Sequence, residues 1–325
     1  MSIAEPAALA TPADAALGAD QALLYKEPVG RSVNAALSSK TGKVLVILLV
    51  FLWTIPTFGV LVSSFRSEIA VKTTGWWQVF WKPSLTLQNY KSVLGGTAGG
   101  GDNLTHFFLN SMRITIPAVV MSVGIAALGA YAFSWMRFKG RDWLYVAVIS
   151  MLVVPLQLAL IPLGRLFTGG AHIGTITIFP NFHLQNSIIP IWVAHTCFGM
   201  PFCIFILKNF IASLPREIIE AARVDGASHL TIFYKLVIPL SVPAIASLGI
   251  FQFVYIWNDL LIGKVYGGTL NQPIIAKLVE VGGNRGQSWH LLTAAAFVSM
   301  ITPLVVFFGL QRYFVRGLLA GSVKG

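Results

Sequence analysis

Six long apolar stretches constrain what this chain can fold into more than any other feature. A helix needs about 20 apolar residues to cross the hydrocarbon core of a bilayer. Five of the stretches contain no Asp, Glu, Lys or Arg, and the fifth along the chain contains one, Asp259. The pattern predicts an all-α, polytopic membrane protein with six transmembrane helices, at Val44–Val62, Ile114–Trp135, Leu144–Leu163, Ile188–Leu207, Leu240–Ile262 and Leu291–Leu310.

Composition supports a membrane protein over a soluble one. Charged residues make up 11% of the 325 residues, whereas soluble domains carry about 25%. The net charge of +11 would suggest nucleic acid as the partner of a soluble protein, but these basic residues are scattered between apolar segments. Membrane orientation explains them better, so the expected surroundings are a lipid bilayer and no nucleic acid.

The basic residues also predict the orientation. With the N-terminus inside, the inner segments 1–43, 136–143, 208–239 and 311–325 hold 14 Lys and Arg in 98 residues. The outer segments 63–113, 164–187 and 263–290 hold 9 in 103 residues. The short loop Arg137–Arg141 carries three of the inner charges, and short loops decide topology most strongly. Both termini are therefore expected in the cytoplasm.

Prolines inside the apolar stretches predict bent helices. A proline removes a helical hydrogen bond, and a membrane bundle tolerates this where neighbouring helices satisfy the freed carbonyl. Kinks are expected at Pro56, Pro117, Pro155, Pro162, Pro190 and Pro243.

The remaining segments divide the chain into two parts. Residues 1–42 are Ala-rich and polar, which predicts a mostly disordered cytoplasmic tail, and 43–325 form the transmembrane domain. The outer segment 63–113 contains a glycine-rich run, Gly95–Gly101, that lacks the Lys-Ser/Thr ending of a phosphate-binding loop. Its aromatic residues suit the membrane interface: Trp76, Trp77, Phe80, Trp81 and Tyr90.

No catalytic or metal site is expected. Cys197 and Cys203 are six residues apart, so they lie on different faces of a helix and cannot pair with each other. No cluster of His, Cys, Asp and Glu has metal-ligand spacing, and no nucleophile elbow supports a hydrolase.

The loop between the fourth and fifth stretches, 211–239, is the most informative segment. Ser213 is expected to cap a helix with Pro215 in its first turn. Asp225-Gly226 should end that helix in a left-handed turn, and Ser228 should cap a second helix that runs towards Pro239.

Side chains of this loop suit a protein partner. The small residues Ala221, Ala222 and Gly226 let another backbone approach closely. Phe233 and Tyr234 are aromatic anchors of the kind found at interfaces.

The spacing in this loop resembles a family signature. Inner-membrane permease subunits of binding-protein-dependent ABC importers carry Glu-Ala-Ala, three residues, Gly, nine residues and then Ile-x-Leu-Pro. Here Glu220-Ala221-Ala222 is followed by Gly226 and then by Leu236-Val237-Ile238-Pro239, with apolar exchanges at the first and third positions.

Two further segments resemble sugar permeases of the maltose and α-glucoside type. Trp257-Asn258-Asp259-Leu260 looks like the fifth-span region of these proteins, and 311–325 resembles the tail of a maltose-transporter subunit. Overall similarity to α-glucoside and other oligosaccharide systems is the only basis for a particular class of sugar.

The resemblance implies a type I importer fold in the bacterial inner membrane, with no enzymatic activity of its own. The implied partners are a second permease in a heterodimer, two copies of a cytoplasmic ATPase that uses ATP and Mg²⁺, and an external sugar-binding protein. It implies that the ATPase docks on the loop and drives alternating access. The residues that would contact the ATPase are Glu220, Ala221, Ala222, Asp225, Gly226 and Pro239.

Polar residues within the spans are candidates for the substrate pathway. Asp259 is an intramembrane charge, and such charges are often functional, although here a structural bond at the helix end with Asn258 is the stronger reading. Gln252 and Tyr255, together with Gln157 and His195, could bond a sugar or a neighbouring helix. In maltose relatives the main sugar site belongs to the partner permease.

Two other functions stay open on the sequence. An importer permease for another solute would share the loop signature. An ion-coupled secondary transporter would usually show paired repeats and more intramembrane charges.

Overall fold

The computed structural model describes residues 39–95, 103–184, 186–282 and 288–322, with the side chains of 313–322 excepted. It forms two units, 1–60 and 61–325. The predicted tail up to residue 38, the glycines from 96 to 101 and the side chains of the C-terminal segment lie outside the described residues. Helix α3 (Lys40–Ser64) begins before the predicted start at Val44. Most of it belongs to the first unit, and its residues from Leu61 onward belong to the second.

Five of the described helices are long and apolar enough to cross a membrane. They match the first, second, fourth, fifth and sixth predicted spans. The second begins ten residues before the predicted Ile114, and the sixth continues twelve residues beyond the predicted Leu310. The five are α3, α6 (Leu104–Trp135), α9 (Ile189–Ile211), the helical run His229–Trp257, and α15 (Trp289–Ser322).

The third predicted span is broken. Its first arm is α7 (Arg141–Ser150) with the 3₁₀ turn η2 (Met151–Val153), and its second arm is α8 (Leu156–Gly169). The arms are bent by 104°, because Val154 and Pro155 are extended, with ψ of 116° and 129°. Proline disfavours the helical conformation in the residue before it. The kink predicted at Pro155 is confirmed as a sharp break, after which α8 begins. Pro190, also predicted as a kink, instead lies in the first turn of α9.

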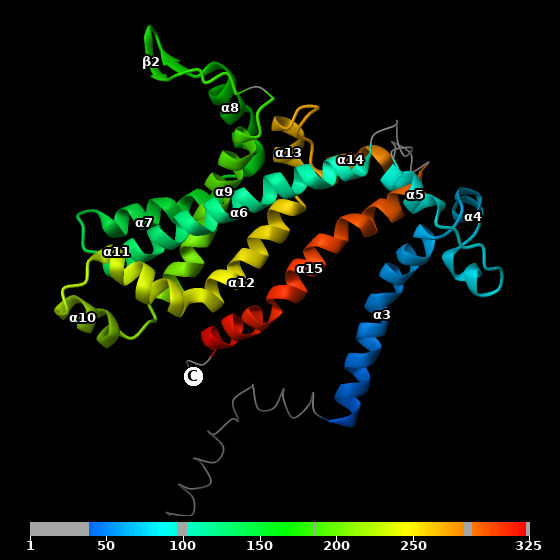
Figure 1. The fold of residues 1–325 in the computed structure, drawn as a ribbon, viewed down its shortest axis with the longest axis horizontal. Coiled ribbons are helices and arrows are strands. Elements are labelled where there is room, and N and C mark those ends of the chain that lie inside the picture. The colour runs from blue at the N-terminus through cyan, green and yellow to red at the C-terminus, as the bar shows by residue number, and fades with distance from the viewer. Residues whose placement is uncertain (1–38, 96–102, 185, 283–287, 323–325) are drawn as a thin grey trace, which may run out of the picture. The chain divides into compact units, whose positions relative to one another are not determined.

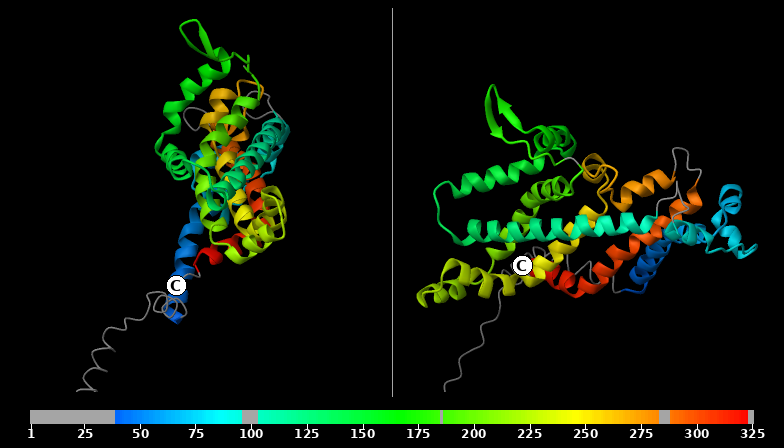
Figure 2. Two further views of the ribbon diagram at one scale, coloured as in Figure 1. Left: turned by 90° about the vertical axis from the view of Figure 1, so that its left-hand side faces the viewer. Right: turned by 45° about the horizontal axis from the view of Figure 1, so that its top comes forward.

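One element departs from the all-α prediction. Strands β1 (Ala171–Ile173) and β2 (Ile176–Phe179) pair antiparallel through a turn in which Gly174 has φ of +60°. Figure 2 shows this hairpin extending away from the helices of the second unit.

The segment after α3 is held by one buried arginine. Arg66 donates to the carbonyls of Ala70 and Thr74 at 3.0 and 3.2 Å, and to the Thr74 hydroxyl. Asn89 donates to the carbonyls of Ser64 and Arg66, both at 2.8 Å. These bonds fold back the short helices α4 (Glu68–Thr73), η1 (Trp76–Phe80) and α5 (Gln88–Gly95).

The centre of the second unit is a set of packed helices. Here α6 lies against α9 and α12 (Ile238–Trp257), and α12 lies against α15 (Figure 1). The short α14 (Ile274–Gly282) packs on α6 and α15. The predicted fifth span ends five residues early, at Trp257, and α13 (Leu261–Tyr266) follows as a separate helix.

A polar contact joins three of these helices at their core. The buried Gln252 amide on α12 donates to Ser122 Oγ on α6 at 3.5 Å. Cys203 Sγ on α9 donates to Oε1 of the same Gln252 side chain at 3.7 Å. A Cβ at Gly199 on α9 would overlap the Gln252 amide. The Gln252 amide therefore occupies the space that a side chain at position 199 would need.

We expect Gly199→Ala to destabilise the protein by about 1–3 kcal/mol, because the methyl group displaces an amide that has polar partners in the core. Gly124→Ala on α6 is the matched control, since a Cβ there meets no atom within 4 Å. Thermal unfolding of the purified chain in detergent measures both. Equal melting temperatures for the two variants would contradict the close contact.

Candidate functional site

The loop between α9 and α12 begins differently from its prediction. Ser213 was expected to cap the next helix, but its hydroxyl donates back to the Phe210 carbonyl of α9 at 2.7 Å. Pro215, expected inside the first turn, is the extended residue that precedes α10 (Arg216–Val224). The N–H groups of Ala212 and Ser213 bond to carbonyls in the last turn of α9. Ser213 therefore extends the end of α9, and its hydroxyl is not at the start of α10.

The turn at the end of α10 agrees with its prediction. Gly226 has φ of +78°, the left-handed conformation that costs glycine little and other residues about 1–2 kcal/mol. Its N–H donates to the Arg223 carbonyl at 3.0 Å, and the N–H of Ala227 donates to the Ala222 carbonyl at 2.9 Å. These two bonds form a Schellman motif. A Cβ at Gly226 would meet open space, so only the backbone conformation demands glycine.

The second helix of the loop is continuous with the fifth span. Ser228 caps α11 (His229–Ile232) by accepting from the Thr231 N–H at 3.2 Å, as predicted. The π-helical turn η3 (Phe233–Val237) then leads into α12. The second helix runs to Pro239 as predicted and continues beyond it: the proline lies in the first turn of α12, and the wider π turn precedes it. The helical run extends from His229 to Trp257.

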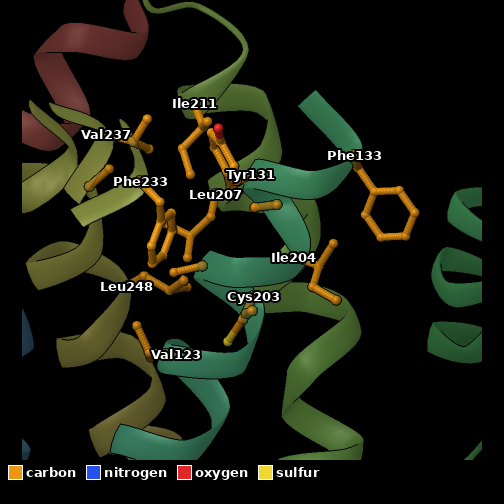
Figure 3. Packing of buried hydrophobic residues seen from close by; sticks show 14 of the residues in the cluster. Val123, Tyr131, Phe133, Cys203, Ile204, Leu207, Ile211, Phe233, Val237 and Leu248 are labelled. Carbon is orange, nitrogen blue, oxygen red and sulfur yellow. The ribbon is translucent and has the colours of Figure 1, made fainter. Parts of the chain in front are cut away.

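Apolar side chains pack this loop against α6 and α9. Ile219 from α10 and Ile232 and Phe233 from the second helix are buried together with residues of α6 and α9. Figure 3 shows Phe233 and Val237 facing Tyr131 and Leu207 within this cluster. Burying one such side chain contributes about 1.5–3 kcal/mol. The loop is thereby part of the core of the second unit.

Polar bonds fasten the loop to the end of α6. Arg223 Nη2 donates to the Trp135 carbonyl at 2.8 Å, and Trp135 Nε1 donates to the Ile211 carbonyl of α9 at 3.1 Å. The Tyr131 hydroxyl lies 2.9 Å from His229 Nδ1. Both helices of the loop are therefore bonded to the same two turns of α6.

Sequence reasoning missed these four residues. Arg223, Trp135, Tyr131 and His229 form pairs that lie 88 and 98 positions apart in the chain. The local pattern carries no signal for such pairs. Phe233 was also misread: it was predicted as an exposed anchor, but it is buried, whereas Tyr234 is exposed as expected.

The predicted contact residues lie mostly on the outside. Glu220, Ala221, Asp225, Gly226 and Pro239 are exposed, and Ala222 is half-buried against the core. Large apolar side chains are exposed beside them, with 87% of Val224 accessible. This exposed set, which we call the turn face, comprises Ile218, Glu220, Ala221, Val224, Asp225, Gly226, Leu230 and Tyr234.

Two of the predicted pathway residues have structural partners. Gln252 is buried in the three-helix contact described above. Asp259 Oδ2 accepts from the backbone N–H groups of Ile262 and Gly263 at 2.8 and 3.4 Å, so it caps α13. His195 Nε2 on α9 lies 3.9 Å from the same oxygen. This carboxylate joins α9 to the junction between α12 and α13.

The other two predicted pathway residues are exposed. Tyr255 and Asn258 lie on one face of α12 with Phe251, at spacings of four and three residues, and Asn258 Nδ2 donates to the Val254 carbonyl of its own helix. The structure thus separates Tyr255 and Asn258, which are accessible, from Gln252 and Asp259, which are not. Gln157 is exposed on α8, and His195 is buried.

Within the described ranges, no group of three or more His, Cys, Asp and Glu is arranged to hold a metal ion. Cys197 and Cys203 are both free thiols, one exposed and one buried. The described residues thus offer two exposed surfaces, the turn face and the face of α12 that carries Phe251 and Tyr255.

Comparison with known proteins gives consistent matches. Residues 118–319 match the family described as binding-protein-dependent transport system inner membrane component. The osmoprotective compounds uptake permease protein GgtD of Synechocystis sp. is 49% identical over 287 residues, which cover 86% of this chain and 91% of that protein. The alpha-glucoside transport system permease protein AglG of Rhizobium meliloti is 49% identical over 246 residues, covering 75% of this chain and 61% of that protein.

More distant matches agree in fold. The diacetylchitobiose uptake system permease protein DasC of Streptomyces coelicolor is 31% identical over 75% of this chain and 83% of that protein. A chain of the bacterial alginate ABC transporter, solved in complex with an alginate pentasaccharide-bound periplasmic protein, superposes with a TM-score of 0.61 at 14% identity. That match covers 85% of this chain and 94% of the other, and it shows that the two share a fold.

We expect Tyr131→Phe to lower the stability by about 1 kcal/mol, because the ring is kept and only the bond to His229 is lost. Tyr234→Phe is the matched control, since that ring is exposed and its hydroxyl bonds to no described residue. Thermal unfolding in detergent compares the two. A shift of equal size in both variants would show that the Tyr131 bond does not fasten the loop.

Proposed function

The chain belongs to the family of binding-protein-dependent transport system inner membrane components, and on this basis we propose that it is the transmembrane permease subunit of an ATP-driven carbohydrate importer. The substrate class is α-glucosides or other oligosaccharides. Several relatives carry names of systems for such sugars. The observation that carries the coupling to ATP is the turn face, held on a loop whose other side is part of the core.

The turn face is the docking surface for a cytoplasmic ATPase. Glu220, Ala221, Asp225 and Gly226 combine charge, small size and a left-handed turn in one exposed corner. Such a corner lets a partner reach the backbone, and the neighbouring Val224 and Tyr234 supply apolar contact. Ala222 supports the surface from beneath, and Pro239 fixes the start of α12 behind it.

Coupling follows from the stiffness of this arrangement. The second helix of the loop is continuous with α12, and Arg223 and His229 tie the loop to α6. When two ATPase subunits close on ATP and Mg²⁺, the turn faces of two paired permeases move together. Rigid helices transmit this motion as alternating access. The hydrolysis belongs to the ATPase, and this chain supplies translocation alone.

The assembly requires three kinds of partner. A second permease forms the other half of the pathway, two ATPase copies bind from the cytoplasm, and an external binding protein delivers the sugar. Both chain termini lie in the cytoplasm, as the distribution of basic residues indicates.

The exposed face of α12 is the part of this chain that lines the pathway. Phe251 and Tyr255 offer aromatic rings and Asn258 an amide, the pairing of flat apolar surface and polar groups that suits a sugar ring. Gln252 and Asp259 act behind this face, as an interhelical contact and a helix cap.

A second cargo has specific support. GgtD, which matches this chain at the same identity as AglG, is named for osmoprotective compounds. Uptake by the reconstituted transporter of a labelled α-glucoside and of a compatible solute decides between the two. Uptake that persists on an ion gradient after ATP is withdrawn would instead overturn the importer proposal.

We expect Gly226→Val to abolish ATP-dependent uptake while the assembled transporter still hydrolyses ATP. Valine in the left-handed region is strained, so the Schellman turn opens and the turn face changes shape. Uptake into vesicles and phosphate release are measured on the same preparation. Gly226→Asn is the control, because asparagine tolerates this conformation and should keep most of the uptake.

Normal uptake by Gly226→Val would show that the turn does not couple. A loss of both variants from the membrane would assign the glycine to folding, which again contradicts the proposal.

We expect Tyr255→Ala to raise the concentration of loaded binding protein needed for half-maximal uptake by about two- to tenfold, because a stacking ring is worth about 0.5–1.5 kcal/mol. Tyr255→Phe keeps the ring and should stay within about twofold of the wild type. Uptake at varied concentrations of loaded binding protein gives both values. Equal effects of the two substitutions would contradict ring stacking in the pathway.

A further inference from the structure

Four arginines surround a cavity between the end of α6 and the loop. The cavity has a volume of about 290 Å³, and Arg137, Arg141, Arg216 and Arg223 line it together with Glu220. The arginines come from three segments: the α6–α7 connection, the start of α7 and α10. The four positive charges outnumber the single negative charge, which the Glu220 carboxylate carries.

Two of the four guanidinium groups have no partner among the described residues. Arg223 donates to the Trp135 carbonyl, and Arg141 Nε lies 2.9 Å from Asp142 Oδ1. Arg137 and Arg216 form no hydrogen bond or ion pair within the described chain. A guanidinium group presents a planar fork of donors that matches a phosphate or carboxylate oxygen pair. The cavity is therefore suited to an anion.

The surroundings of the cavity identify the kind of anion. Arg137 and Arg141 also line an adjoining cavity of about 450 Å³ together with Trp143 and with Asp142, the partner of Arg141. Trp143 is 82% exposed, and Leu144 and Val146 after it on α7 are more than half exposed. Tryptophan is enriched at the height of lipid headgroups, and apolar helix faces contact acyl chains. Basic groups and an exposed apolar face thus lie side by side.

We propose that this cavity binds the phosphate headgroup of an anionic phospholipid from the leaflet on the side of the loop. Arg137 and Arg216 hold the phosphate, and Trp143 and Leu144 contact the upper part of the acyl chains. A basic pocket between membrane helices on the cytoplasmic side is a known way to bind anionic lipid. That the leaflet is the cytoplasmic one rests on the proposed function, whereas the lipid site itself does not.

An acidic side chain of a partner protein would satisfy the same arginines. It would not use the apolar face of α7 beside the cavity, which as an arm of the third span already contacts lipid. A lipid fills both parts at once. The bound headgroup would also join α10 to the α6–α7 connection, adding a second link beside the bond from Arg223 to Trp135.

The test measures lipid retention on the full chain purified in detergent, by native mass spectrometry with added phosphatidylglycerol or phosphatidylcholine. We expect the wild type to prefer phosphatidylglycerol. Arg137→Gln combined with Arg216→Gln should weaken its binding about thirtyfold, since each basic group near a lipid surface contributes about fivefold. Arg137→Lys combined with Arg216→Lys keeps the charge and loses the fork, so it should fall between.

The matched control is Lys235→Gln combined with Lys264→Gln, which removes the same charge from exposed positions that do not line the cavity. It should keep the preference for phosphatidylglycerol. Unchanged retention in the double arginine variant overturns the proposal. So does complete displacement of the lipid by inorganic phosphate, which would mark a site for the free anion.

A loss of coupled uptake by the arginine variant with lipid retention intact would assign the cavity to an acidic partner and overturn the lipid site. Retention is measured without any partner chain. Its result is therefore independent of whether the importer proposal holds.

Discussion

The packing of Ile219, Ile232 and Phe233 among α6 and α9 is the interaction on which the rest of the loop depends. A loop outside a bundle ordinarily moves freely, because few of its side chains are buried. Here the inner sides of both loop helices belong to the core. The exposed turn face therefore keeps a fixed position relative to the membrane helices, which a docking surface that transmits force requires.

The breaks in the helices are resolved by local chemistry rather than by lipid. Backbone groups without partners cost several kcal/mol in a bilayer, and two of the breaks are accommodated by their own residues. Asp259 supplies acceptors for the first N–H groups of α13. The π turn accommodates Pro239 at the start of α12. At Pro155 two extended residues separate the arms, and α8 begins without a side-chain cap.

Much of the architecture could be predicted from the sequence because it follows from short-range rules. Apolar length gave the positions of the spans, and the Asp225-Gly226 pair gave the left-handed turn that ends α10. The misreadings share a cause. Ser213 and Phe233 each satisfy a local rule that contacts elsewhere override: a bond back to α9 and burial in the core. The ties from Arg223 and His229 to α6 depend on long-range contacts that no local pattern encodes.

The length of the continuous helix from His229 to Trp257 has a consequence for where the loop lies relative to the bilayer. At 1.5 Å per residue its 29 residues extend about 43 Å, whereas the hydrocarbon core is about 30 Å thick. α6, with 32 residues, is longer still at about 48 Å. Both helices thus outreach the acyl chains by two turns or more. Helices of this length can cross the acyl chains and still extend beyond them, so the loop between them can stand outside the hydrocarbon core.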